Sequence, residues 1–270
     1  MRAHGENAEI AVEESMERIR EIENLMSKTI ETSDIYKLNN NPETELEIDN
    51  QSMNVLKKAL EYAELTAGDF DPTIGALVEL WGIGTEAAAL PEESEIEAAL
   101  KNTGYNYLKL ADNTAEITKA GVKIDLGGIA KGYAAEEVKK VVQKYNVEHA
   151  FVNLGGNVLV IGDKVDGSPW KIGIQDPREG RGNVMAVVDA VDKTIVTSGN
   201  YERYFEEDGK LYHHILNPKT GYPAKNNLLS VSIISRNSFD ADALSTAVYV
   251  MGVQKGIKFI EKMENIDVMF

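Results

Sequence analysis

Two oxygen-bearing side chains near the C-terminus have the spacing of a metal site. Asp242 and Thr246 are separated by one helical turn, so on a helix their side chains share one face. Mg²⁺ keeps water or substrate phosphates among its ligands, so one carboxylate, one hydroxyl and a backbone carbonyl would suffice to bind it. A second interpretation is that Asp240 or Asp242 caps this helix, and the spacing alone favours the cap.

A glycine-rich turn in the middle of the chain could hold phosphate oxygens. Residues 125–132 read DLGGIAKG and precede a helical pattern, so backbone amides would lie at a helix N-terminus, where anions bind readily. The segment lacks the ending of a Walker A loop and does not have the spacing of the dinucleotide fingerprint. Tight turns from strand to helix also need glycine when no ligand is present, so the turn alone does not establish a binding site.

Two adjacent histidines precede a turn that is bounded by prolines. His213 and His214 lie in an expected strand, where alternation sends the two rings to opposite faces. One ring can therefore face a site, although a structural role is the commoner one for a lone histidine. The chain has four histidines in all, which argues against a zinc site.

The composition excludes several classes of chemistry. The 270 residues include no cysteine and carry a net charge of −16, so disulfides, thiolate nucleophiles and iron–sulfur clusters are excluded. Nucleic-acid binding is not expected, because its affinity comes largely from cationic side chains that neutralise phosphates. An anionic substrate would need a metal ion or backbone amides at its site. We see no apolar signal-peptide region and no run long enough for a transmembrane segment.

The elements that must position these residues are helices and short strands in irregular order. Apolar residues recur every three or four positions over 8–26, which predicts an amphipathic helix. Strands in clusters that are interrupted by helices favour an α+β fold with mostly antiparallel sheets packed with helices. Further helices are expected over 53–63, 91–104, 134–145, 240–251 and 253–264. Strands are expected over 105–110, 114–117, 122–126, 150–154, 158–161, 170–174, 184–191, 211–216 and 229–233 and around Tyr204, with turns over 34–51, 153–157 and 197–201.

The order of the short motifs is more specific than any one of them. Together they resemble the ApbE family of FAD:protein FMN transferases, and the resemblance covers nearly the whole chain. In chain order the motifs are DFDPTIG (69–75), LWGIG (80–84), IDLGGIAKGY (124–133), NLGGN (153–157), TSG (197–199), HHILNPKTGYP (213–223) and ADALSTA (241–247).

The resemblance implies a single flavin transferase domain over 1–270 and a Mg²⁺-dependent reaction. Such an enzyme moves FMN from FAD to a Thr or Ser hydroxyl of an acceptor protein through a phosphoester bond and releases AMP. The acceptor would be, for example, a subunit of a membrane redox complex. The implied fold has T-fold-like antiparallel sheets, with FAD held in a cleft between two lobes.

The resemblance also implies roles for individual residues. Asp242 and His214 would be catalytic, His214 as the base that takes the acceptor's hydroxyl proton, because an imidazole can titrate near neutral pH. His214 could instead only bind FAD. The implied Mg²⁺ ligands are Asp242, Thr246, the backbone carbonyl of Gly128 and, nearby, Ser245. The implied FAD contacts are Asn39, Asp69, Phe70, Asp71, Asp125, Lys131, Thr197, Ser198 and His214.

Two other functions and two locations stay open at this point. If water attacks FAD, the same site would be an FAD pyrophosphatase that gives FMN and AMP, and a third alternative is a protein that binds FAD without turnover. Many relatives are secreted or lipid-anchored, which implies an extracytoplasmic, membrane-associated location. This chain shows neither a signal peptide nor a lipid-acceptor Cys, so a cytoplasmic location is the alternative.

Overall fold

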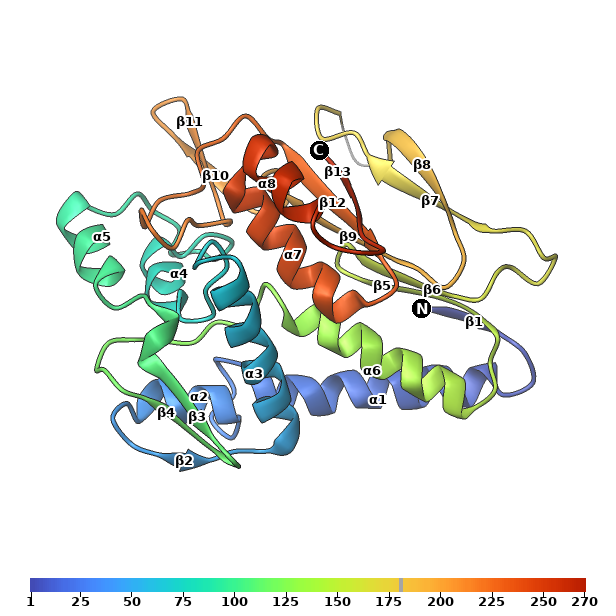
Figure 1. Cartoon of the computed structure of the whole chain (residues 1–270), viewed down its shortest axis with the longest axis horizontal. Helices are drawn as coiled ribbons and strands as arrows, with labels where there is room; N and C mark the ends of the chain where they lie inside the picture. The colour runs from blue at the N-terminus through green and yellow to red at the C-terminus, as the bar shows by residue number, and fades with distance from the viewer. Residues whose placement is uncertain (180–181) are drawn as a thin grey trace.

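A six-stranded antiparallel sheet is the centre of the fold. The computed structural model describes residues 1–179 and 182–270 (Figure 1). The strand order is β1-β5-β6-β9-β12-β13, and each neighbouring pair is antiparallel. With eight α-helices in the described residues, this sheet confirms the predicted α+β class. The strands are β1 (Arg2–His4), β5 (His149–Leu154), β6 (Asn157–Ile161), β9 (Thr194–Gly199), β12 (Ser230–Ser235) and β13 (Asp267–Met269).

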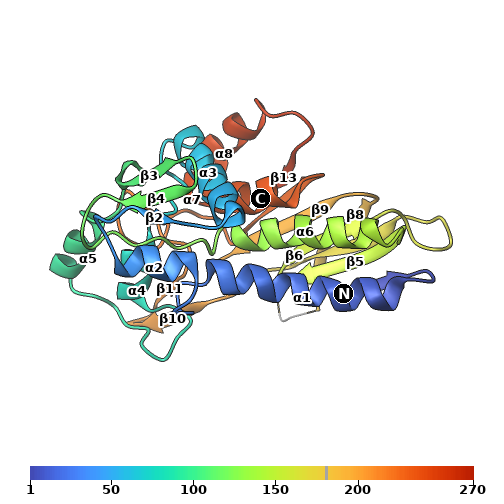
Figure 2. The ribbon, with the colours of Figure 1, turned by 90° about the horizontal axis from the view of Figure 1, so that it is seen from below.

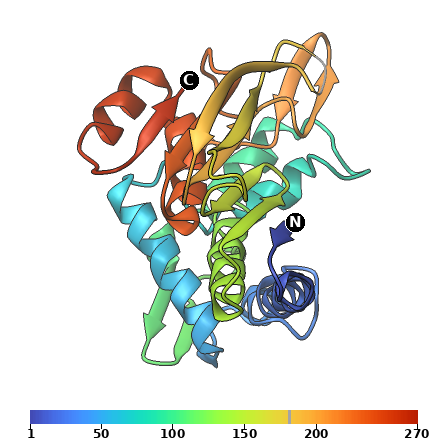
Figure 3. The ribbon, with the colours of Figure 1, turned by 90° about the vertical axis from the view of Figure 1, so that its right-hand side faces the viewer.

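Helices cover one face of this sheet. Helix α1 lies beside α6, and α7 packs against α6 and against strands β9 and β12 (Figure 2, Figure 3). Ala135, Val138 and Val142 of α6 are fully buried against β5 and β6, and their helical spacing forms the apolar stripe that fixes α6 on the sheet. The helices are α1 (Ala8–Met26), α2 (Asp34–Asn40), α3 (Asn50–Leu65), α4 (Gly75–Trp81), α5 (Glu93–Leu100), α6 (Ala130–Lys144), α7 (Ser238–Met251) and α8 (Val253–Ile260).

Three smaller sheets complete the described part of the fold. Strands β7 (Trp170–Gln175) and β8 (Val184–Ala190) form a hairpin that packs on the other face of the large sheet, against Val160 and Ile195. Leu159, next to Val160, faces α6 instead, as the alternation of side chains along a strand requires. The other two sheets are β2-β4-β3 (Leu46–Glu47, Thr114–Ile117 and Leu108–Ala111) and the hairpin of β10 (Tyr204–Glu207) and β11 (Lys210–His213).

Helices α6 and α7 approach each other closely at Gly132. A Cβ added to Gly132 would come within 2.3 Å of the Ser238 carbonyl oxygen and 2.7 Å of Asp242 Cβ. Because the nearer contact is with backbone, a side chain here would push the two helices apart. Gly132 therefore sets the distance between the glycine turn at the start of α6 and the residues of α7.

We expect Gly132→Ala to lower the free energy of unfolding by about 2–3 kcal/mol, because the added methyl group overpacks the contact between the two helices. Denaturant unfolding followed by circular dichroism measures this change. Lys140→Ala on the exposed face of α6 is the control, since it removes only a surface ion pair with Glu137 and should change stability by less than about 1 kcal/mol. Equal stability of Gly132→Ala and the unaltered chain would contradict the packing argument.

The structure corrects four parts of the predicted element map. Segment 34–51 is not all turn, because α2 forms there with Ser33 as its cap, whose Oγ accepts the N–H of Tyr36. Residues 75–81 form α4, which was not predicted. Segment 122–126 is not a strand, since only Lys123 makes an isolated bridge and the amide of Ile124 bonds to a side chain. Residues 197–199 belong to strand β9, and the turn follows them.

Several ends also differ from the prediction. Helices α5 and α8 end four residues before the predicted bounds of 104 and 264, and β11 ends at His213 instead of 216. Residues 105–107 form a 3₁₀ turn (Tyr105–Tyr107) ahead of β3. None of the helices in the described ranges has the length and apolar character needed to cross a membrane.

Candidate active site

The predicted metal ligands meet where the glycine turn faces helix α7. A Cβ added to Gly128 would lie 3.2 Å from Thr246 Oγ1 and 3.1 Å from Phe70 Cε2, so the turn backbone lies directly against both side chains. Asp242 lies one helical turn before Thr246 on the same side of α7. The crossing of α6 and α7 thus brings Gly128 to Asp242 and Thr246, from which it is more than 100 positions away in the sequence.

Asp242 is a buried carboxylate at the N-terminal end of α6. Its Oδ2 accepts the backbone N–H of Gly132 at 2.8 Å, and the Lys131 Nζ lies 3.8 Å from its Oδ1. Burial raises the pKa of Asp242, whereas the Lys131 charge and the Gly132 N–H act in the opposite direction. A carboxylate held in this way is stabilised in its charged form by a further cation.

The interpretation of Asp240 or Asp242 as a helix cap is wrong. Asn237 caps α7, and its Oδ1 accepts the N–H groups of Phe239 and Asp240. The helix begins at Ser238, two residues before the predicted start, so Asp242 lies beyond the free N–H groups that a cap satisfies. Asp240 instead forms an ion pair with Lys58 at 3.0 Å.

The serines predicted near the metal site form a short hydrogen-bonded chain. Ser245 Oγ donates to the Asp242 carbonyl oxygen at 2.9 Å. It lies 2.9 Å from Ser198 Oγ on β9, so Ser198 is the donor to Ser245. Thr197, the residue before Ser198 in the strand, points to the opposite face of the sheet and bonds to Ser232 at 2.7 Å. Ser198 thus supports helix α7 at the site, and Thr197 joins β9 to β12.

The side chains of Asn39 and Asp125 hold the start of the glycine turn. Asn39 makes two bonds to the Ile124 backbone, one from its Nδ2 to the carbonyl at 2.9 Å and one from the amide to its Oδ1 at 2.7 Å. Asp125 accepts a hydrogen bond from the N–H of Gly127 at 2.8 Å and forms an ion pair with Lys28 at 2.6 Å. These bonds fix the backbone that would have to approach a ligand.

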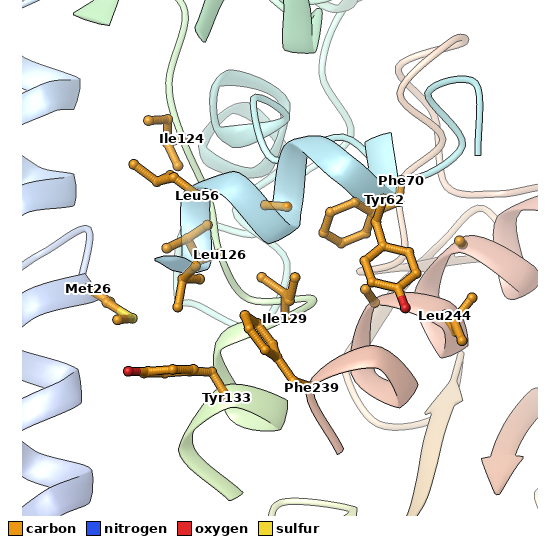
Figure 4. Packing of buried hydrophobic residues seen from close by; sticks show 14 of the residues in the cluster. Met26, Leu56, Tyr62, Phe70, Ile124, Leu126, Ile129, Tyr133, Phe239 and Leu244 are labelled. Atoms are coloured by element: carbon orange, nitrogen blue, oxygen red, sulfur yellow. The ribbon is translucent and has the colours of Figure 1, made fainter. Parts of the chain in front are cut away.

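The rest of the turn is held by Lys131 and by apolar packing. Lys131 Nζ donates to the Gly127 carbonyl at 2.8 Å, so this one ammonium group touches the turn and lies near Asp242. Ile124, Leu126 and Ile129 are buried in the main core, and Figure 4 shows Leu126 and Ile129 between α3 and the start of α6. The turn is therefore a rigid support, as a binding site requires.

The loop from Asp69 to Asp71 borders the turn. Asp71 Oδ1 accepts both the N–H and the hydroxyl of Thr73, and its Oδ2 accepts the N–H of Tyr105 at 2.9 Å. Burial raises the pKa of Asp71, and the bonds from Thr73 lower it. Asp69 forms an ion pair with Lys219 at 2.6 Å. Asp71 thus organises the loop, while Asp69 joins it to the proline-bounded turn.

The two histidine rings have different surroundings, and because β11 ends at His213, the predicted alternation of the two rings along a strand does not apply. His213 is buried, with its Nε2 3.2 Å from the Ala224 carbonyl oxygen and its ring edge-on to Tyr249. His214 Nδ1 lies 3.2 Å from the Arg203 carbonyl oxygen, which can only accept, so Nδ1 carries the proton and Nε2 has the lone pair. Burial lowers the pKa of His214 to about 4, and the charge of nearby Lys131 acts in the same direction. His214 is thus a neutral ring near Lys131, and its Nε2 makes no hydrogen bond to a residue that the structure describes.

The donors present fit magnesium better than zinc. Within residues 1–179 and 182–270, no three His, Cys, Asp or Glu side chains gather in the way that a metal cluster needs. The set of Asp242, Thr246 and the Gly128 backbone offers oxygen atoms alone. One carboxylate with neutral oxygen donors suits a hard cation that keeps several water or phosphate ligands.

A cavity adjoins the strand that contains His213. It has a volume of about 860 Å³ and is lined by His213, Tyr212, Asn200 and segment 222–227, among others. This volume is within the range of cofactor sites. Asp242, Thr246 and Gly128 are not part of its lining, so the cleft between two lobes and the FAD contacts remain predictions, as does the T-fold likeness.

Sequence reasoning missed two lysines that complete the site. Lys28 neutralises Asp125, and Lys219 neutralises Asp69. Lys219 lies in the proline-bounded turn that the sequence had singled out, so its place in that motif was a usable signal. Lys28 follows the first helix and has no local pattern that would have identified it.

The comparisons with known proteins identify the family of this chain. A family model described as the ApbE family matches residues 2–270. The FAD:protein FMN transferase of Treponema pallidum (strain Nichols) is 38% identical over 239 residues, which cover 83% of this chain and 66% of that protein. The FAD:protein FMN transferase of Vibrio cholerae is 34% identical over 246 residues, which cover 90% of this chain and 74% of that protein. The first match thus spans just under two thirds of its relative's length.

Solved structures give the same result over more of the chain. The crystal structure of an ApbE protein from Thermotoga maritima is 39% identical and has a TM-score of 0.89, with 97% of this chain and 86% of that chain covered. The flavin transferase ApbE from Vibrio cholerae is 30% identical and has a TM-score of 0.88, with 97% and 84% covered. Because the family match extends over nearly all residues, the chain belongs to the ApbE family, whose named relatives are FAD:protein FMN transferases.

Proposed function

We propose that this chain transfers FMN from FAD to a Thr or Ser hydroxyl of an acceptor protein, releases AMP and depends on Mg²⁺. The observation that carries the proposal is the contact between the Gly128 backbone and Thr246 Oγ1 beside the buried carboxylate of Asp242. This set of oxygen donors, next to a helix N-terminus, supports the binding of a metal-bound diphosphate by a protein whose net charge is −16.

Asp242, Thr246 and the Gly128 carbonyl would hold the metal, with Ser245 orienting the helix backbone between them. When bound, Mg²⁺ polarises the diphosphate and stabilises charge on the leaving group. Asn39 and Asp125 keep the glycine turn in place, so the Gly128 backbone would meet the metal-bound diphosphate in a fixed position. Lys131, whose Nζ lies 3.8 Å from Asp242 Oδ1, would offset part of the phosphate charge.

The transfer forms one bond and breaks one bond at phosphorus. The acceptor hydroxyl oxygen attacks the FMN phosphorus in line, and the bond from that phosphorus to the AMP oxygen breaks. His214 Nε2 takes the hydroxyl proton, because its lone pair is free and its ring is neutral. AMP leaves with the electron pair of the broken bond.

Mass spectrometry of a flavin-acceptor domain incubated with the chain, FAD and Mg²⁺ tests the proposal. We expect the acceptor to gain the mass of one FMN on a Thr or Ser, with one AMP released for each FMN transferred. A reaction without Mg²⁺ is the control. Free FMN and AMP with an unmodified acceptor would instead indicate an FAD pyrophosphatase. The absence of both products would indicate a flavin-binding protein.

A further inference from the structure

A hollow with three lysines lies on helix α8, beside the loop that borders the site. It has a volume of about 240 Å³, and its lining consists of Asp69, Met251, Lys255, Lys258, Phe259 and Lys262. Lys255 and Lys258 are three positions apart and share one side of α8, and Lys262 lies in the turn that follows the helix. Met251 and Phe259 supply apolar surface between them. We call these six residues the lysine hollow.

The lysine hollow is positive on a protein that is strongly acidic. Its three lysines are exposed and form no ion pair with any described residue, unlike Lys28 and Lys58, which pair with aspartates. Asp69, the one acid in the lining, is neutralised by Lys219 at 2.6 Å. Three ammonium groups are thus uncompensated on a chain whose net charge is −16, which makes this patch attractive to anionic partners.

The lysine hollow also lies next to the predicted reaction site. Asp69 lines it, and the following residue, Phe70, has its ring against the Gly128 backbone. Only Phe70 therefore separates the part of this loop that lines the hollow from the glycine turn. Its volume is below the range of about 300–1,000 Å³ that is typical of sites for small molecules, so it suits one or two side chains of a peptide better than a nucleotide.

We propose that the lysine hollow docks an acidic segment of the acceptor protein. This inference rests on the proposed function, because a transferase must bring a second protein to the glycine turn. The lysines would pair with the carboxylates of that segment, and Met251 and Phe259 would receive an apolar neighbour. Complementary charge of this kind selects the partner and speeds its encounter, while the acidic remainder of the surface repels acidic segments elsewhere.

Fluorescence anisotropy with a labelled tetra-aspartyl peptide that contains one threonine tests the docking directly. The probe is titrated with the full chain and with Lys255→Glu/Lys258→Glu. We expect a Kd about tenfold higher for the double variant, weaker binding as salt rises, and no binding of a tetra-asparaginyl peptide. Lys37→Glu/Lys109→Glu is the matched control, because both lysines are exposed and neither pairs with a described residue. It should bind the probe like the unaltered chain.

Parallel measurements separate this inference from the proposed function. The double variant should keep the affinity for FAD and the Mg²⁺-dependent release of AMP, while its KM for the acceptor rises about tenfold. Equal loss of probe binding in both double variants, or no probe binding by the unaltered chain, would overturn the docking site. Loss of FAD affinity in the Lys255→Glu/Lys258→Glu variant would also overturn it, since the hollow would then bind the nucleotide. If the unaltered chain neither released AMP nor transferred FMN, the proposed transferase function would be refuted. The peptide-binding measurement would still test the docking site.

Discussion

Asp242→Asn should lower the Mg²⁺-dependent release of AMP from FAD about a thousandfold and leave the fold intact. The reason is that Asp242 has two functions that this substitution separates. Its Oδ2 accepts the N–H of Gly132 at the start of α6, and an Asn carbonyl oxygen can accept the same bond. The metal, however, loses the one carboxylate in its predicted ligand set. A thousandfold change corresponds to about 4 kcal/mol, a reasonable size for metal stabilisation of a phosphoryl transition state.

Stability measurements distinguish loss of the metal from loss of the fold. Burial raises the pKa of Asp242, so the contribution of this group to the free energy of unfolding decreases as pH rises. A neutral Asn therefore should not destabilise the protein at neutral pH. Asp242→Ala removes the bond to Gly132 as well and should cost about 1–3 kcal/mol.

Asp240→Asn is the matched control for this experiment. It changes a carboxylate on the same helix that pairs with Lys58, outside the predicted ligand set. We expect unchanged release of AMP and a stability change of less than about 1 kcal/mol. Rates are measured over a range of Mg²⁺ concentrations. Normal turnover by Asp242→Asn at ordinary Mg²⁺ would refute the assignment of this residue as a ligand.

The parts of the fold that were predicted correctly are those with a strong local pattern. The apolar period of the first helix gives its bounds as 8–26, which are the observed bounds. The short helix α2 was missed because its buried Ile35 and Leu38 are too few to establish a period in a polar segment. Segment 122–126 has the apolar pattern of a strand, but its backbone bonds to Asn39 and to the Pro72 carbonyl, and no local pattern indicates that.

In the candidate site, too, the features with a local sequence pattern were predicted and those that join distant residues were not. Asp242 and Thr246 were found together because helical spacing is a local property, although spacing could not exclude a cap. The question was decided by the cap at Asn237, which precedes the true start of the helix at Ser238. The ion pairs of Lys28 with Asp125 and of Lys219 with Asp69 join residues 97 and 150 positions apart, so only the folded chain reveals them.

His214→Asn should lower the rate of FMN transfer about a hundredfold or more while the Kd for FAD changes little. General-base catalysis contributes on the order of 10²–10⁴ to a rate, and Asn cannot accept a proton in that role. The Asn amide can still donate to the Arg203 carbonyl, the bond that His214 Nδ1 makes at 3.2 Å. The substitution thus keeps the contact that orients the side chain and removes the basic Nε2.

The pKa of His214 sets the pH below which its ring is protonated and can no longer act as a base. Burial lowers its pKa to about 4, so the ring is unprotonated throughout the neutral range and loses its basic form only as pH falls through about 4. An ordinary histidine would lose its basic form near pH 6.5.

Transfer by His214→Asn is measured by single turnover with saturating FAD, and FAD affinity is measured by flavin fluorescence. His213→Asn is the matched variant, since that ring bonds to Ala224 and should affect stability more than the chemical step. If His214→Asn weakened FAD binding as much as it slowed transfer, His214 would be a flavin contact and another group would have to take the hydroxyl proton.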